Sequence, residues 1–293
     1  MAGGQERVLR RRIKSVQATR KITKAMELIA ASQIARAQAR IAANRPYRDA
    51  MKRVIVEAAL GDPVVAGKLL ATPEQVRTVA VLAIVGDRGL AGAYNGSVLR
   101  ATERLVNELK AKGTKVQLYA VGKKAGAYLR FRGFEVTDNF IGFADRPTFA
   151  DARRVASAVA EPFAADEVQQ VLLVSTRYLS SSSQQVESRQ LLPLAMPEGV
   201  TSSATGYTEF EPDVETLLHG LSARALESEV FTALLEGSAS FHTSQQRAMA
   251  AATDNADELA TNLKRVMNRA RQDSITTEIM EIVSGAEALR SGK

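Results

Sequence analysis

The stretch SITTEIMEIVSGAEAL, residues 274–289, lies close to the C-terminal end of the chain. Its apolar side chains recur at steps of four and three, the spacing of one face of an α-helix: Ile275, Ile279, Ile282, Ala286 and Leu289. Gly285 stands inside this helix although glycine there costs roughly 1 kcal/mol relative to alanine. We therefore expect another backbone to approach closely at Gly285, and other chains to cover the apolar face.

The helical pattern extends upstream from this stretch to about Glu211, and no proline follows Pro212. An unbroken helix from Glu211 to Leu289 would be about 120 Å long. That length exceeds the helices of ordinary domains and predicts a coiled coil. Gly237 is the point at which we expect this helix to be weakest.

The N-terminal segment predicts a second long helix. RVLRRRIKSVQATRKITKAMELIAASQIARAQARI, residues 7–41, contains neither Gly nor Pro and is rich in good helix formers. Its apolar residues widen from a narrow stripe to a broad arc near Met26, so the helix needs partners on more than one side. Pro46 is expected to kink the helix or to end it.

The middle of the chain has a different period. VRTVAVLAIV (76–85) and VQQVLLVSTRYL (168–179) are β-branched apolar runs typical of buried strands. Between them helical patterns alternate with further strand candidates, among them FEVTDNF (134–140). This alternation predicts a mostly parallel sheet covered by helices, with QQVESRQLLPL (184–194) as a final edge strand.

These parts predict an α+α/β fold: a long antiparallel coiled coil of N- and C-terminal helices with an inserted Rossmann-like α/β domain. The expected boundaries are a coiled-coil helix at 1–60, a linker at 61–75, the α/β domain at 76–200, a linker at 201–210 and the long C-terminal helix at 211–293. Because the N-terminal helix is shorter, the end of the C-terminal helix should overhang. An isolated apolar helix is marginal in water, so we expect other chains to surround the overhang.

Composition excludes several function classes. The 293 residues include no Cys, which excludes disulfides, thiolate metal sites and cysteine nucleophiles, and only two His, too few for a histidine-rich metal site. We expect no catalytic residue, metal site or cofactor in this chain. No apolar run approaches the roughly 18 residues that span a bilayer. The formal charge is +7, and residues 1–53 hold fourteen Lys and Arg against three Asp and Glu. The excess positive charge therefore lies in the N-terminal segment.

Basic helices bind nucleic acid, anionic lipid or acidic protein surfaces. Here the charges, which include Lys21 and Lys24, flank the widest apolar arc, and aromatic residues that could stack on bases make up only 5%. Docking onto an acidic protein surface is the preferred interpretation, with Met26 as a candidate contact. A coiled coil on nucleic acid is the less favoured alternative.

A glycine-rich loop, VGDRGLAGAYNG (85–96), follows the first predicted strand and precedes a helix. Such loops can cradle phosphate, but the spacing fits neither GxGxxG nor GxxxxGK[ST]. A nucleotide-binding enzyme is therefore a weak alternative, and a loop that holds a neighbouring protein through Asp87 and Arg88 is preferred. Glu278 and Glu281 could act as an acid–base pair, but no nucleophile or metal ligand lies near them, so catalysis is not expected.

The motifs together resemble the γ subunit of the F-type ATP synthase. RRRIKSVQATRKITKAMELIAAS resembles the first helix of that family, DRGLAGAYN resembles its loop, which usually reads close to DRGLCGGYN, and ITTEIMEIVSGAEA matches its C-terminal signature. The likeness covers nearly the whole chain. The likeness departs from the family pattern at three places. Phe241 stands where the family often has an acidic residue, and Gln245 and Gln246 stand nearby, where an Arg of the family is commonly displaced or missing. Ala91 stands in the loop where Cys is common.

The resemblance implies a central rotor shaft, a non-catalytic subunit of the proton-transporting ATP synthase, or H+-transporting two-sector ATPase. Its partners would be a 3:3 hexamer of alpha and beta subunits, the epsilon subunit and the membrane c-ring, with no nucleic acid and no small-molecule substrate. The subunit would be peripheral, on the cytoplasmic side of a bacterial cell membrane, and bound there only through the complex. The resemblance implies a first set of contacts to the surrounding ring, called the catch, at Arg271, Gln272, Thr276, Glu278 and Glu281, and a second catch at Arg88 and Gly89. Met26 would lie at the bearing, and the basic helix with Lys21 and Lys24 would suit an acidic lever on the catalytic subunits. Asp87 and Gly285 complete the expected subunit-interface residues.

Overall fold

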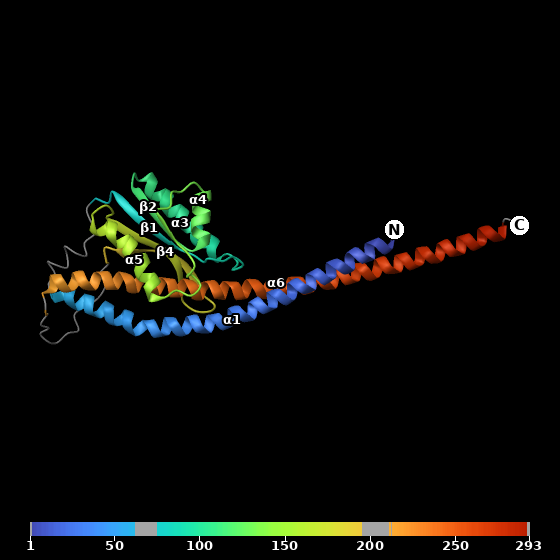
Figure 1. The fold of residues 1–293 in the computed structure, drawn as a ribbon, viewed down its shortest axis with the longest axis horizontal. Helices are drawn as coiled ribbons and strands as arrows, with labels where there is room; N and C mark the ends of the chain where they lie inside the picture. Colours follow the sequence, from blue (N-terminus) through green and yellow to red (C-terminus); the bar gives the residue numbers. More distant parts are fainter. Residues whose placement is uncertain (1, 62–74, 195–210, 212, 292–293) are drawn as a thin grey trace. The chain divides into compact units, whose positions relative to one another are not determined.

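The computed structural model describes residues 2–61, 75–194, 211 and 213–291. It divides into two compact units: unit 1 comprises residues 1–29 and 246–293, and unit 2 comprises residues 30–245. Helices α1 (Ala2–Gly61) and α6 (Val214–Ser291) contribute to both units (Figure 1). The predicted linkers at 61–75 and 201–210 lie almost wholly outside the described residues.

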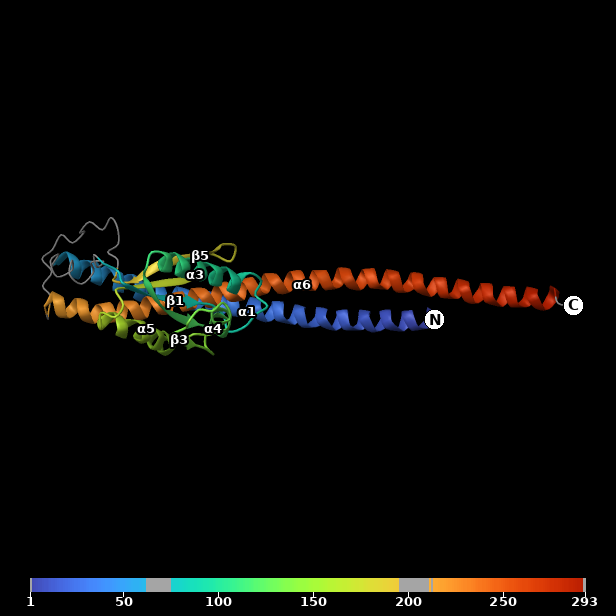
Figure 2. The ribbon, with the colours of Figure 1, turned by 90° about the horizontal axis from the view of Figure 1, so that it is seen from above.

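Unit 1 is an antiparallel pair of helix segments. The hydroxyl groups of Thr23 and Thr253 share a buried hydrogen bond of 2.8 Å, and Arg20 forms an ion pair with Asp257. Residue numbers therefore decrease along α1 while those of their partners increase along α6, as an antiparallel coiled coil requires. Within this unit α6 continues past the N-terminal end of α1 (Figures 1 and 2).

Unit 2 contains the rest of both helices and a five-stranded sheet in the order β3-β2-β1-β4-β5. Strands β1 (Thr78–Ile84), β2 (Lys115–Val121), β3 (Asp138–Phe140) and β4 (Gln170–Tyr178) run parallel, and β5 (Gln184–Leu192) pairs antiparallel to β4. Helices α3 (Tyr94–Ala111), α4 (Lys123–Phe131) and α5 (Phe149–Ala164) connect them. The predicted fold class is confirmed, although the strand predicted at 134–140 is shorter and begins only at Asp138.

The side chains of β1 alternate between two cores, as a strand buried on both faces requires. Val79 and Val81 pack in a cluster with residues of α3 and α4. Ala80, Leu82 and Ile84 pack in a second cluster with residues of α5 and α6. The sheet therefore lies between a layer of ordinary helices and the long helix α6 itself, which makes α6 part of the unit's core.

Two expectations about the long helices can be compared with the structure. Of the two outcomes expected at Pro46, a kink or an end, the end is excluded, because α1 continues through Pro46 to Gly61. Gly237 is no weak point, because α6 is unbroken there. A Cβ at position 237 would lie 3.1 Å from the hydroxyl oxygen of Tyr94 and 3.5 Å from Ile84 Cγ2. The missing side chain at Gly237 thus lets α6 approach the end of β1 closely.

A charged cluster joins α1, β5 and α6 inside unit 2. The Glu229 carboxylate forms ion pairs with Arg189 and, at 3.4 Å, with Lys52. Burial alone would raise the pKa of Glu229, but these two cations and their hydrogen bonds hold it below its usual value. The charge on Glu229 is therefore compensated within the fold.

Candidate interaction surfaces

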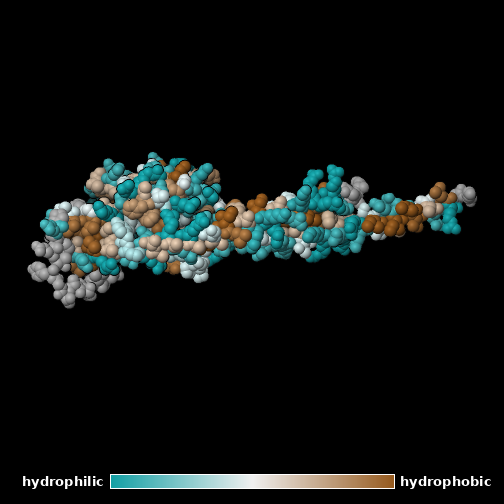
Figure 3. Space-filling model, turned by 60° about the horizontal axis from the view of Figure 1, so that its bottom comes forward, coloured by the Kyte–Doolittle hydropathy of each residue, from teal (hydrophilic) through white to brown (hydrophobic). Residues whose placement is uncertain are grey.

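The end of α6 in unit 1 presents apolar side chains that nothing in the described part of the chain covers. Ile282 is 72% exposed and Leu289 is 82% exposed, and four further large apolar residues are exposed beside them: Ile275, Ile279, Met280 and Val283. Figure 3 shows hydrophobic colour along this end of the helix. Burial of each such side chain would contribute about 1.5–3 kcal/mol, so this surface is suited to association.

The C-terminal residues predicted as subunit contacts share this exposed segment. All six are exposed on α6: Arg271, Gln272, Thr276, Glu278, Glu281 and Gly285. The Thr276 hydroxyl donates to the Gln272 carbonyl at 3.0 Å, which holds that side chain against the helix. Apart from the adjacent backbone of α6 itself, no described atom lies within 4 Å of a Cβ built on Gly285. The close backbone approach expected at Gly285 is therefore not made within the described part of the chain.

Basic and apolar side chains are interleaved on the α1 segment of unit 1. Lys21 and Lys24 are exposed, Lys24 bonds Glu27 at 3.0 Å, and Met26 is half-buried. Three large apolar residues near them are about 60% exposed: Ile22, Leu28 and Ile29. A partner that combines acidic and apolar groups would match this surface.

Hydrogen bonds of two side chains, Asn95 and Asp87, hold the loop after β1 in place. Asn95 accepts from the Gly86 N–H at 2.9 Å and donates to the Arg88 carbonyl at 2.9 Å. The Asp87 carboxylate accepts from the backbone N–H groups of Lys123, Gly142 and Ala144 at 2.9–3.1 Å. Asp87, predicted as a contact for a neighbouring protein, thus uses its carboxylate to hold unit 2 together, and the Gly86 N–H is already bonded within the loop.

The outer side of the loop carries the exposed groups that a partner could contact. Arg88 is exposed and pairs with Asp145 at 3.0 Å, and Gly89 is half-exposed. Leu90 is 63% exposed and adopts a left-handed backbone with a φ of 61°. Sequence reasoning missed Leu90, because an apolar residue in a glycine-rich loop gives no sign that it faces outward.

Arg88, Asp145 and His242 form an electrostatic cluster beneath the loop. Burial raises the pKa of Asp145, with a smaller contribution from Asp87, although Arg88 and His242 act in the opposite direction. Burial lowers the pKa of His242, against the carbonyl and carboxylate of Asp145 and the side chain of Gln245. His242 is thus a buried residue rather than a residue of the helix surface.

The departure from the family pattern at Phe241 has a structural counterpart. Phe241 is buried against Tyr94, with ring centroids 5.7 Å apart in an edge-to-face arrangement, and Ala91 completes this small cluster. Phe241 therefore occupies an apolar site, where the resemblance led us to expect an acidic residue, and Ala91 fills space beside it.

The described residues include neither a metal-binding cluster nor a membrane-spanning helix. These contain no group of three or more His, Cys, Asp or Glu arranged to hold a metal ion. None of the helices described is both long and apolar enough to cross a bilayer.

The fold and its exposed surfaces define an assembly subunit with a helical pair and an α/β unit. The family model described as "ATP synthase" matches residues 5–289. ATP synthase gamma chains from Parafrankia sp. and Kineococcus radiotolerans are 46% and 44% identical, over 99% and 98% of both chains. The chain belongs to the family of ATP synthase gamma chains.

Solved structures show the same fold. One chain of the Euglena gracilis mitochondrial ATP synthase, in rotational state 3, has a TM-score of 0.68 at 18% identity and covers 99% of this chain and 96% of its own length. A chain of the Tetrahymena thermophila mitochondrial ATP synthase, from its central stalk and c-ring, has a TM-score of 0.62 at 24% identity, over 79% and 99%. The long helix pair with an α/β unit is thus the architecture of these chains too.

Proposed function

We propose that this chain is the central-stalk rotor subunit of a bacterial proton-translocating ATP synthase and performs no bond chemistry itself. The family of the chain and the source of its structural neighbours support this role. The observation that carries it is the uncovered apolar end of α6, because a helix with Ile282 and Leu289 in water needs a surrounding sleeve.

The proposed partners follow from the two kinds of surface. A hexamer of alpha and beta subunits would enclose unit 1, where apolar residues of α6 and basic residues of α1 offer complementary contacts. Unit 2 would contact the epsilon subunit and the c-ring, on the cytoplasmic side of the membrane. The chain would be peripheral and held at the membrane only through these partners.

Rotation would act on the catalytic sites through unequal contacts. The two helices of unit 1 differ in sequence, so each beta subunit would meet a different surface at each angle. A contact that favours one conformation of a catalytic site shifts its population toward that conformation. Catch contacts at Arg88, Gly89, Arg271, Gln272 and Thr276 would then transmit torque in discrete steps.

Reconstitution with alpha and beta subunits tests this function. The chain has no cysteine, so Lys112→Cys, at the exposed end of α3, supplies a unique thiol for a bead. ATP should drive one-way rotation of the bead, with one copy of the chain per hexamer. Absence of a fixed stoichiometry, or hydrolysis without rotation in a complete complex, would refute the rotor role.

A matched pair of variants separates the apolar stripe from the helix as such. Ile279→Asp/Ile282→Asp places charge on the stripe, and Thr277→Asp/Ser284→Asp places the same charge on the opposite face of α6. The first variant should lose assembly or torque by tenfold or more, while the second should stay close to the parent. Equal behaviour of the two would mean that no sleeve contacts the stripe.

A further inference from the structure

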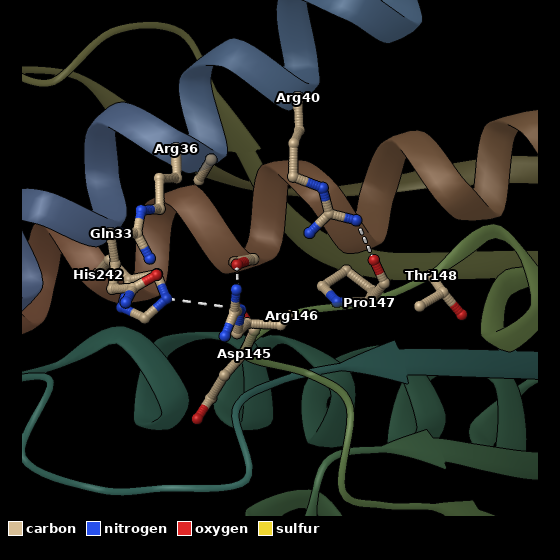
Figure 4. Close-up of a pocket in the computed structure, with 10 residues that line it drawn as sticks. Gln33, Arg36, Arg40, Asp145, Arg146, Pro147, Thr148 and His242 are labelled. Atoms are coloured by element: carbon tan, nitrogen blue, oxygen red, sulfur yellow. Dashed lines mark hydrogen bonds between the residues drawn. The ribbon is translucent and has the colours of Figure 1, made fainter.

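A pocket of about 490 Å³ lies within unit 2, between α1, α6 and the segment that leads into α5. Helix α1 contributes Gln33, Arg36 and Arg40, the segment at 145–148 contributes Arg146, and α6 contributes Ser238 and His242. Figure 4 shows the side chains of Arg36, Arg40 and Arg146 around a common space. The volume falls within the usual range for small-molecule sites.

Three guanidinium groups face this space without a carboxylate to balance them. Arg36 and Arg40 lie one turn apart on α1, and Arg146 extends toward them from the opposite wall (Figure 4). Among the ion pairs formed within the described residues, none includes any of these three arginines. Arg40 donates to the Pro147 carbonyl, a neutral acceptor.

The nearest acid does not neutralise the pocket. The Asp145 carboxylate pairs with Arg88 at 3.0 Å and points away from Arg36 and Arg40 (Figure 4). The backbone carbonyl of Asp145, by contrast, accepts from the Ser238 hydroxyl at 2.7 Å. That bond fixes the segment at 145–148 against α6, so the backbone that carries Arg146 is held in place.

The nearby positive charge also affects the pKa of Arg40. The pKa of Arg40 is lowered, first because burial desolvates its guanidinium and second because the charge of Arg146 lies near it. Two cations that are held close together without an intervening anion raise each other's free energy. An anion between them would remove this cost.

We propose that this pocket binds a phosphate-type oxyanion. Guanidinium groups bind phosphate oxygens in a bidentate manner, with charge-assisted hydrogen bonds. A single carboxylate would leave two of the three positive charges unpaired, whereas a phosphate dianion leaves one. The multiply charged anion is therefore the better match.

Such a ligand would join elements that are far apart in the sequence. Arg36 and Arg40 belong to α1 and Arg146 to the segment before α5, so one phosphate would bridge them inside unit 2. Because binding to the folded state alone stabilises it, phosphate should raise the melting temperature of unit 2. The ligand would act as an effector of stability or stiffness and not as a substrate.

Equilibrium dialysis of the full chain against inorganic phosphate, at constant ionic strength with chloride, measures this binding. We expect a saturable site with one phosphate per chain. Arg40→Gln and Arg146→Gln should each weaken it by about tenfold or more, since each removes a charged hydrogen-bond donor. Arg45→Gln, an exposed arginine of α1 outside the pocket, should leave it unchanged.

Further arms identify the source of the phosphate group. ADP and ATP that bind more tightly than inorganic phosphate, and lose affinity in the same variants, would identify a nucleotide phosphate; weaker nucleotide binding would identify free phosphate. Phosphate binding that is absent, or equal in all variants, would overturn the proposal. It would also be overturned if Arg40→Gln and Arg146→Gln weakened only assembly with alpha and beta subunits, because the pocket would then receive a partner's acidic side chain.

Discussion

The ring of Phe241 on α6 lies directly against the backbone of Gly86 at the end of β1. A Cβ built on Gly86 would come within 2.9 Å of Phe241 Cδ2. The aromatic residue at 241 and the absence of a side chain at 86 therefore depend on each other. This contact joins the long helix to the start of the glycine-rich loop within unit 2.

Gly86→Ala should destabilise unit 2 by about 1–3 kcal/mol, because the ring of Phe241 must shift. Phe241→Ala should cost about 3–5 kcal/mol through the cavity that it leaves. In urea unfolding, the double variant should lose less than the sum of the two single losses, since alanine at 241 makes room for the new Cβ. Gly89→Ala is the control, because its Cβ would lie 3.7 Å from Lys124 Cε, an ordinary contact. Additive losses would show that the two residues are not coupled.

Periodicity and residue type were enough to predict the architecture. The four-and-three spacing through Ile275 and Ile282 marked a helix, and the β-branched run at 76–85 marked a buried strand. Both signals are local, since they depend on which neighbours along the chain share a face. The continuation of α6 through Gly237 could not be predicted in this way, because it depends on packing against Tyr94 and Ile84, which are distant in sequence.

The pocket in unit 2 could not be predicted in the same way. Arg40 and Arg146, and then Arg146 and His242, are separated by roughly 100 residues each, and no local pattern connects them. The hydrogen bonds to the Asp87 carboxylate could not be predicted either. The N–H groups of Gly142 and Ala144 that donate to it come near Asp87 only when β3 joins the sheet. The exposed tip of α6 was predictable because a helix shows its own apolar face.

Removal of residues 275–293 should leave unit 2 folded, because its hydrophobic clusters include none of these residues. All six Tyr and nine Phe lie within residues 30–245. Near-ultraviolet circular dichroism therefore reports on unit 2 alone. We expect its unfolding free energy to change by less than about 0.5 kcal/mol, while torque and coupling in the reconstituted complex fall. Loss of the near-ultraviolet signal on truncation would contradict the division into two units.

Lys21→Glu/Lys24→Glu should weaken assembly and the coupling of ATP turnover to proton transport. Both side chains are exposed, so the stability of the chain itself should change little. Association with the alpha and beta subunits should slow by about tenfold at low salt, and the difference should shrink as salt screens the charges. Lys112→Glu/Lys115→Glu makes the same charge change on exposed residues of unit 2. An equal effect of the two pairs would mean that net charge, and not the α1 surface, is responsible.

Glu236 on α6 gives unit 2 a predictable pH dependence. Burial raises the pKa of Glu236, and the charge of Glu187 raises it further. The charges of Arg189 and Arg177 and a hydrogen bond from the backbone of Tyr178 lower it by less, so the net shift is upward. A raised carboxyl pKa means that the folded state holds the proton more tightly than the unfolded state. The stability contributed by this group is therefore complete below its ordinary value of 4.5 and is lost as pH rises above that value.

Glu236→Gln removes the cost of a buried charge at neutral pH. The variant should be more stable than the parent at pH 7, by on the order of 1 kcal/mol, and the gain should vanish below pH 4.5. Urea unfolding followed by near-ultraviolet circular dichroism at a series of pH values measures this difference in unit 2. Glu135→Gln, at an exposed position of the same unit, is the matched control. A gain for Glu236→Gln that did not depend on pH would show that the amide packs better and that the carboxylate carries no penalty, since only a titrating group can make the difference follow the pH.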